Sequence, residues 1–117
     1  MGESPTEIAG RYFEAWRAKD MDAYRALLAD GADFAGPMGQ AHGVDECVAG
    51  MRGLASMTTD VVVHKMLSDD NDVITWFELH TADAAPCPVA NWTHVEDGKI
   101  TQIRVTFDPR PLLPPLQ

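Results

Sequence analysis

From about residue 59 onward the sequence alternates between apolar and polar residues, and this change of period constrains the fold more than any other feature. Four successive stretches, TTDVVVHKMLS, DVITWFELHTA, CPVANWTHVE and KITQIRVTF, have the pattern of half-buried β-strands. Clusters of Asp, Asn, Gly, Ala and Pro separate the stretches and are typical of turns. Strands joined by short turns pair antiparallel, so this half of the chain predicts an antiparallel sheet.

The first half of the chain has helical spacing instead. Ser4-Pro5-Thr6-Glu7 has the composition of a capping box with proline at the first helical position. The apolar residues that follow recur every three or four positions, which predicts an amphipathic helix. Asp20 suits the start of a second helix that Gly31 ends, and a third helix is predicted from about Val44 to Leu54.

Between the second and third helices we expect a short strand over residues 32–38, followed by loop at GQAHG. The 117 residues suffice for one domain and are too few for two, so residues 1–117 form a single domain. Residues 109–117 are a proline-rich tail that cannot continue a sheet. The predicted fold is α+β: a cone-like curved antiparallel sheet of about four long strands plus a short first strand, with three N-terminal helices over its concave face.

The charge excludes some classes of partner. Nine basic and eighteen acidic residues give a net charge of −9, which argues against nucleic acids and anionic membranes. The N-terminus lacks a signal pattern and no apolar run could span a membrane, so we expect a cytoplasmic protein. Both cysteines are expected to be reduced and buried. The four histidines lack paired ligand spacing and no cofactor motif is present, so we expect neither a metal nor a cofactor.

The turn at Glu96-Asp97-Gly98 decides which way Asn91 faces. A three-residue turn would place Asn91 opposite Ile103, on the same face as Val89, Val105 and Phe107. A two-residue turn would place Asn91 opposite Arg104 and mix charged with apolar residues on both faces. We favour the three-residue turn, which directs Asn91 towards the core and leaves Trp92 and His94 on the opposite face. There the amide needs a partner, either a neighbouring loop, water or a ligand.

Three segments together resemble the nuclear-transport-factor-2-like superfamily: RYFEAWRAKDMDAYRALLADGADFAGPMG, HGVDECVAGMRGL and VEDGKITQIRVTFD. Its members include SnoaL-like polyketide cyclases and ketosteroid isomerases. The resemblance covers nearly the whole chain and implies the cone-like fold described above. It leaves the activity open, because members of the superfamily range from isomerases, cyclases and hydrolases to proteins without known chemistry.

Ketosteroid isomerases, to which the chain is similar, hold the substrate oxygen with a tyrosine and a protonated acid, and move the proton with an aspartate. The resemblance puts the tyrosine at Tyr12 and the acid at Asn91. The aspartate falls on Gly36, which cannot move a proton. A catalytic protein of this type would therefore need a different base in the same cavity.

The strand DVITWFELHTA offers candidates for that base. Its odd positions, Val73 to Leu79, form the cleaner core pattern. Its even positions combine Trp76 with the titratable Glu78 and His80, and the resemblance implies that this even set faces the cavity. His80 would act as acid or base, and Glu78 would have a raised pKa if it were buried beside Trp76. The alternatives are a partly exposed histidine at a strand end and a surface glutamate.

Two functions remain open. One is cofactor-independent acid–base chemistry on a small, largely apolar molecule, an isomerisation, cyclisation or hydration. The other is binding without catalysis, by a dimer whose interface covers Trp92 on the convex face of the sheet. Asp108 either acts at the cavity mouth or bonds Arg110 or a loop amide. The candidate catalytic residues are Tyr12, Asn91, His80 and Glu78, and the candidate pocket residues are Trp16, Phe34, Met38, Met51, Met66, Trp76, Val89, Val105, Phe107 and Asp108.

Overall fold

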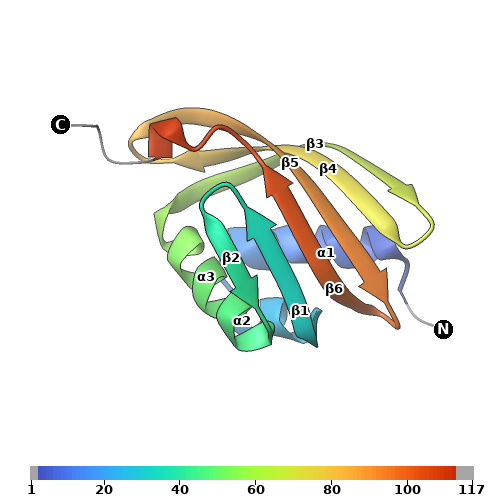
Figure 1. Ribbon diagram of the computed structural model, residues 1–117. Coiled ribbons are helices and arrows are strands. Elements are labelled where there is room, and N and C mark those ends of the chain that lie inside the picture. Colours follow the sequence, from blue (N-terminus) through green and yellow to red (C-terminus); the bar gives the residue numbers. More distant parts are fainter. Residues whose placement is uncertain (1–2, 113–117) are drawn as a thin grey trace.

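The computed structural model describes residues 3–112, which form a six-stranded curved sheet with three helices on one side (Figure 1). The expected α+β class is confirmed, with six strands in place of about five. The elements in chain order are α1 (Pro5–Ala18), α2 (Met21–Ala26), β1 (Leu28–Gly36), β2 (Gly39–His42), α3 (Val44–Met57), β3 (Thr58–Asp69), β4 (Asp72–Thr81), β5 (Ala84–Glu96), β6 (Lys99–Thr106) and the short 3₁₀ helix η1 (Arg110–Leu112).

The N-terminal helix forms for the local reasons its sequence indicates. The Ser4 hydroxyl accepts a hydrogen bond from the Glu7 amide, and the Glu7 carboxylate accepts one from the Ser4 amide, which completes the capping box. The aromatic face of α1 packs onto β4, where the Phe13 and Phe77 rings lie 4.9 Å apart and the Trp16 and Phe77 rings 5.5 Å apart. These contacts fix α1 across the helix-facing side of the sheet.

Two expectations for residues 20–42 were wrong. The second helix ends at Ala26, because Leu27 and Leu28 are already drawn into the core at the start of β1. The segment expected to be a loop at GQAHG contains β2, which pairs antiparallel with β1 from Gly36–Gly39 to Asp33–His42. A tight hairpin around Pro37-Met38 therefore replaces the single short strand.

The strand order is β2-β1-β6-β5-β4-β3, so β1 and β6, which are far apart in sequence, are neighbours in the sheet. β1 and β6 are parallel, with Phe34 opposite Ile103, so the sheet is mixed and not wholly antiparallel as expected. The remaining neighbours are antiparallel. The third helix extends to Met57, beyond the expected end at Leu54. Of the tail over residues 109–117, residues 110–112 form η1 and residues 113–117 lie outside the described residues.

The β5–β6 hairpin has the two-residue turn, which was the less favoured alternative, and Asn91 nevertheless faces the core as predicted. Asp97 and Gly98 form a two-residue turn, both with positive φ (51° and 77°), and Glu96 lies opposite Lys99. This turn alone would pair Asn91 with Arg104. An irregularity between His94 and Val95 shifts the register by one residue, so Asn91 lies opposite Val105. The three-residue turn would have paired it with Ile103. The shift restores the side-chain parity that the three-residue turn would have given.

The core lies between the helices and the inner face of the sheet. Its largest fully buried side chains include Tyr12, Phe13, Tyr24 and Phe77. Cys47 and Cys87 are buried and not bonded to each other, as expected. Within residues 3–112 no helix is long and apolar enough to cross a membrane.

Candidate functional site

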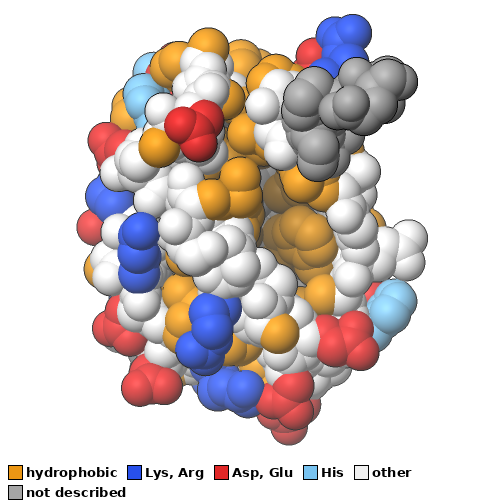
Figure 2. Space-filling view, turned by 90° about the vertical axis from the view of Figure 1, so that its left-hand side faces the viewer, with side chains coloured by type: hydrophobic (Ala, Val, Ile, Leu, Met, Phe, Trp, Pro, Cys, Tyr) orange, Lys and Arg blue, Asp and Glu red, His pale blue; other side chains and the backbone are white. Residues whose placement is uncertain are grey.

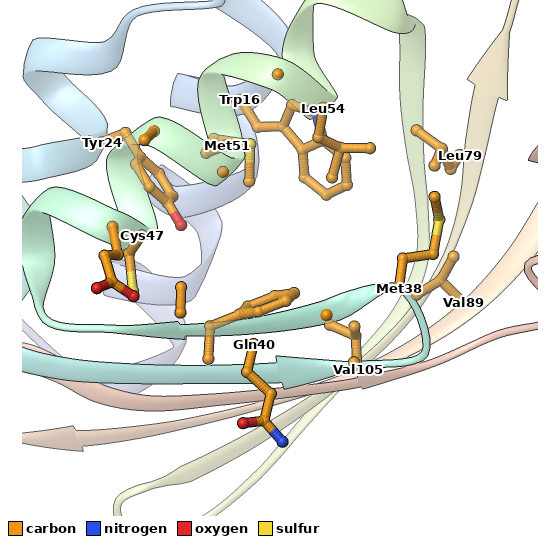
Figure 3. Close-up of a pocket in the computed structure, with 18 of the residues that line it drawn as sticks. Trp16, Tyr24, Met38, Gln40, Cys47, Met51, Leu54, Leu79, Val89 and Val105 are labelled. Atoms are coloured by element: carbon orange, nitrogen blue, oxygen red, sulfur yellow. The ribbon is translucent and has the colours of Figure 1, made fainter.

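A cavity of about 500 Å³ opens between α3 and the inner face of the sheet. Figure 2 shows the hollow from outside, with hydrophobic side chains gathered in its depth. In Figure 3, Trp16, Met51 and Leu54 border the cavity from the helices, and Val89 and Val105 border it from β5 and β6. A cavity of this size and composition matches the usual range for sites that hold small organic molecules.

Small residues on α3 keep the cavity open. Gly53 follows Gly50 by three residues and Ala49 by four, so these small residues are neighbours on α3, and all three are exposed and line the cavity. A Cβ placed on Gly50 or Gly53 would meet no atom within 4 Å. This side of α3 therefore leaves a slot that larger side chains would fill.

Methionines border the cavity at two depths. Met51 is buried on α3, whereas Met38 and Met57 are exposed where the cavity meets solvent. Their unbranched side chains change rotamer at low cost, so they suit a mouth that adapts to its ligand. Gln40 also borders the cavity, but its amide points away from it (Figure 3).

The strongest polar feature of the lining is a pair of tyrosines. Tyr12 on α1 and Tyr24 on α2 are buried with ring centroids 5.4 Å apart, and the Tyr24 hydroxyl points into the cavity (Figure 3). Burial raises the pKa of Tyr12 to about 12, although the Asn91 and Tyr24 side chains beside its hydroxyl oppose the rise. Burial also raises the pKa of Tyr24 well above its ordinary value. Both phenols therefore stay protonated at neutral pH and can donate a hydrogen bond.

Asn91 lies on β5 directly behind this lining. Its side chain faces inwards, as predicted, and is 1% exposed, with Thr75 and Val105 as its cross-strand neighbours. Although it adjoins the Tyr12 hydroxyl, neither its amide nitrogen nor its amide oxygen reaches hydrogen-bonding geometry with any described protein group. A buried amide without a partner costs about 1–3 kcal/mol.

Gly36 lines the cavity at the position where the resemblance implies a catalytic aspartate. A Cβ at Gly36 would lie 2.5 Å from Cγ2 of Val105, closer than real Cβ contacts allow. The parallel β1–β6 pairing brings these two residues together. The glycine therefore allows β1 to approach β6, and an aspartate there would require Val105 to move.

The expected position of the even residues of β4 was wrong. Trp76 is 49% exposed and Glu78 and His80 are half-buried, whereas Phe77 and Leu79 line the cavity. Glu78 and His80 therefore lie on the outer face of the sheet, opposite to Asn91. The clean core pattern of the odd residues was the correct signal, since side chains alternate strictly between the two faces of a strand.

On the outer face, the Glu78 carboxylate joins two histidines. Nε2 of His80 lies 3.0 Å from one of its oxygens, and Nε2 of His64 lies 3.1 Å from the other. Hydrogen bonds from His80 and then His64 lower the pKa of Glu78. The raised pKa predicted for a Glu78 buried beside Trp76 is therefore not found, and the alternative, a glutamate at the surface, is the correct one. The pair cannot serve as the base of a reaction inside the cavity, so the catalytic arrangement predicted for Tyr12, Asn91, Glu78 and His80 does not assemble.

Three of the predicted pocket residues lie elsewhere: Trp76 on the outer face, as described above, and Met66 and Asp108. Met66 packs against the core outside the cavity lining. Asp108 is exposed and bonds the guanidinium and the amide of Arg110, with a shortest distance of 2.7 Å, which lowers the pKa of its carboxyl to about 2. The other predicted residues that do line the cavity are Trp16, Phe34, Met38, Met51, Val89, Val105 and Phe107.

Several lining residues were not predicted. Tyr24 and Cys47 were assigned to the apolar sides of their helices without any functional role, although both border the cavity (Figure 3). The thiol of Cys47 donates to the Ala32 carbonyl at 3.5 Å, and burial raises its pKa, which makes it a poor nucleophile. Among residues 3–112, no three His, Cys, Asp or Glu side chains are grouped to hold a metal ion.

The fold and the cavity define a class of small α+β proteins in which helices and a curved sheet enclose an apolar chamber. Within that class, the chain belongs to the family of SnoaL-like domains, whose model matches residues 9–103. This confirms the resemblance drawn from the sequence. No curated protein matches the chain significantly.

Solved structures agree with this assignment. A protein from Kribbella flavida is 27% identical over 91% of this chain and 88% of its own, with a TM-score of 0.86. An NTF2-like protein of unknown function from Cytophaga hutchinsonii is 26% identical over 96% of each chain, with a TM-score of 0.84. An epoxide hydrolase of the LEH-like type from Mycobacterium tuberculosis shares the fold at 20% identity, over 92% of this chain and 84% of its own, with a TM-score of 0.78.

Proposed function

We propose that the protein binds a small, neutral or weakly polar organic molecule in its cavity, without transforming it. The observation that carries this proposal is the lining, which is apolar except for a few groups and includes the paired phenols of Tyr12 and Tyr24. Burying the apolar surface of a ligand there would supply most of the affinity. The two phenols would orient it by hydrogen bonding.

The polar groups indicate that the ligand carries an oxygen. The hydroxyl of Tyr24 points into the cavity, and Tyr12 adjoins Asn91, whose amide lacks a partner. A hydroxyl or carbonyl oxygen of the ligand that reaches these groups would accept a hydrogen bond from a tyrosine hydroxyl and give the buried Asn91 amide a hydrogen-bond partner. A ring system with one oxygen at its end would fit this arrangement.

Catalysis is the weaker alternative for this chain, although relatives of the same fold include an epoxide hydrolase. Acid–base chemistry requires a group that accepts a proton near pH 7, within hydrogen-bonding reach of the substrate. Glycine stands at the position implied for that group, and Glu78 and His80 face away. Glu46, which is exposed, is the only carboxylate among the described lining residues.

The proposal can be tested with 2-naphthol, a fluorescent, neutral bicyclic phenol. We expect saturable binding with one site per chain, a higher melting temperature in its presence, and recovery of unchanged ligand. Gly53→Leu should place a side chain in the slot and weaken binding at least tenfold. Isothermal titration should also give a negative heat-capacity change, as expected when apolar surface is buried.

Gly10→Leu provides the matched control. Gly10 is also inside a helix and its Cβ would also meet nothing within 4 Å, but it lies outside the cavity lining. Both substitutions replace a helical glycine by a better helix former, so both variants should fold. Equal affinity of the two variants, or conversion of the ligand by the wild type, would contradict the proposal.

A further inference from the structure

The described lining of the cavity carries almost no charged side chains, and the one it has is negative. Among the described residues of the lining, Glu46 is the only one that carries a formal charge at neutral pH, and no lysine, arginine or histidine borders the cavity. The whole chain carries a net charge of −9, so the surrounding potential has the same sign. The site therefore offers no cation to a negatively charged ligand.

Glu46 is held in place at the rim. It lies in the first turn of α3, and one of its carboxylate oxygens accepts the backbone amide of His42 at 2.9 Å. This bond ties the carboxylate to His42 at the end of β2, and Glu46 lies one turn before Gly50 on α3. The Glu46 carboxylate is therefore held in position at the exposed part of the cavity lining.

An anion that entered this cavity would lose its hydration and gain no compensating cation. Removal of an unpaired carboxylate from water into an apolar site is strongly unfavourable. The interior hydroxyls of Tyr12 and Tyr24 could offset a part of that cost, but Glu46 adds repulsion at the rim. A neutral molecule of the same shape encounters neither penalty.

We propose that the cavity selects neutral ligands against anionic ones of equal size, and that Glu46 is a specificity-determining residue. The ligands excluded are fatty acids, other organic carboxylates and phosphate esters. The ligands accepted are neutral alcohols, phenols, ketones and amides. This inference rests on the proposed binding function and adds the charge class of the ligand.

The test compares naphthalene-2-carboxamide with naphthalene-2-carboxylate, which have nearly the same shape and differ in charge. At pH 7.5 we expect the wild type to bind the amide at least a hundredfold more tightly. Glu46→Gln keeps an oxygen that can accept the His42 amide and removes the charge. It should strengthen carboxylate binding about three- to tenfold and change amide binding much less, so that the ratio of the two affinities falls. Glu46→Lys should lower that ratio further.

Asp22→Asn is the matched control, because it removes one negative charge from the first turn of another helix, outside the lining. It should change neither affinity. Equal binding of amide and carboxylate by the wild type would overturn the inference while leaving the binding function intact. A wild type that binds 2-naphthol but not the carboxamide would overturn it too, since the selection would then be by polarity. Loss of all three ligands would instead refute the proposed function itself.

Discussion

Asn91 has a polar side chain in a largely apolar, buried environment. Its amide is buried among Val89, Val105 and Thr75, yet neither polar atom has a partner within the described protein. We expect Asn91→Leu to raise the free energy of unfolding of the ligand-free protein by about 1–2 kcal/mol, because an unpaired amide is replaced by an apolar group. Urea titration followed by tryptophan fluorescence measures this difference.

Thr93→Val provides a comparison on the same face of β5. The Thr93 hydroxyl is also buried without a partner and, like Asn91, Thr93 lies outside the lining; unlike Asn91, it is not one of the side chains beside the Tyr12 hydroxyl. This variant should gain stability by up to about 1 kcal/mol and bind 2-naphthol normally. Asn91→Leu should bind it more weakly. A lower free energy of unfolding in Asn91→Leu would contradict this expectation and show that a hydrogen bond between Asn91 and Tyr12 stabilises the wild type.

The buried tyrosines predict how the protein responds to alkali. The pKa of Tyr12 is about 12 in the folded protein and about 10 in the unfolded chain. The folded state therefore holds its proton more tightly, and stability that is complete below pH 10 is lost as the pH rises towards 12. The loss for Tyr12 alone should be about 3 kcal/mol.

This alkaline transition can be observed directly, because Tyr12 and Tyr24 are the only tyrosines of the chain. Absorbance at 295 nm should show no tyrosinate in the folded protein at pH 10.5, and a midpoint near pH 10 in urea. Tyr12→Phe should reduce the fall in unfolding free energy between pH 9 and pH 11.5. Early, reversible ionisation of both phenols in the folded protein would contradict their burial.

Among the elements, the β5–β6 hairpin depends most on one backbone conformation. Gly98 has φ 77°, in the left-handed region that a residue with a Cβ adopts at a cost. We expect Gly98→Ala to lower the free energy of unfolding by about 1 kcal/mol. Gly10→Ala in α1 should raise it by about 0.5–1 kcal/mol, since φ is negative there and alanine is the better helix former. Changes of the same sign in a urea titration would contradict this account.

Most of the secondary structure could be predicted from the sequence. The capping box, the aromatic face of α1 and the alternation of the last four strands predicted most of the fold, because each depends on neighbouring residues. The Asp97-Gly98 turn was misjudged because the compensating irregularity lies between His94 and Val95, inside the strand, where no Gly or Pro marks it in the sequence. β2 was missed because four small or polar residues form a strand only beside β1.

The candidate site was less predictable than the fold. Tyr12 and Asn91 were found through the resemblance, and the inward direction of Asn91 through the parity of β5. Glu78 and His80 were misplaced because the resemblance was preferred to the core pattern of their own strand. The slot along α3 could not be predicted, since glycine and alanine in a helix reveal an opening only when the facing strand is known.

At the scale of the whole molecule, the outer face of the sheet carries an exposed apolar patch made of Leu67, Ile74, Trp76 and Trp92. Ile74 lies directly between Leu67 and Trp92 in neighbouring strands, so the patch is continuous. Contiguous exposed apolar surface of this kind is typical of an interface. The homodimer expected from the sequence stays a prediction, and this patch is the surface that it would use.

Light scattering after size-exclusion chromatography tests that prediction. The wild type should have twice the mass of one chain, and Trp76→Glu should have the mass of a single chain with its fold retained by circular dichroism. Ala18→Glu, which adds the same charge on an exposed position of α1, should remain dimeric. A wild type of single mass at micromolar concentration would refute the dimer.

The parallel pairing of β1 with β6 also determines when the chamber can exist. β1 ends at Gly36, whereas its partner begins only at Lys99. Contacts so distant in sequence form slowly, and none of them can form on a growing chain until β6 has been synthesised. Until β6 is synthesised, the apolar sides of the helices and of β1 therefore stay partly exposed to solvent. A ligand could therefore assist folding only after β6 has paired with β1, because both strands contribute side chains to the cavity.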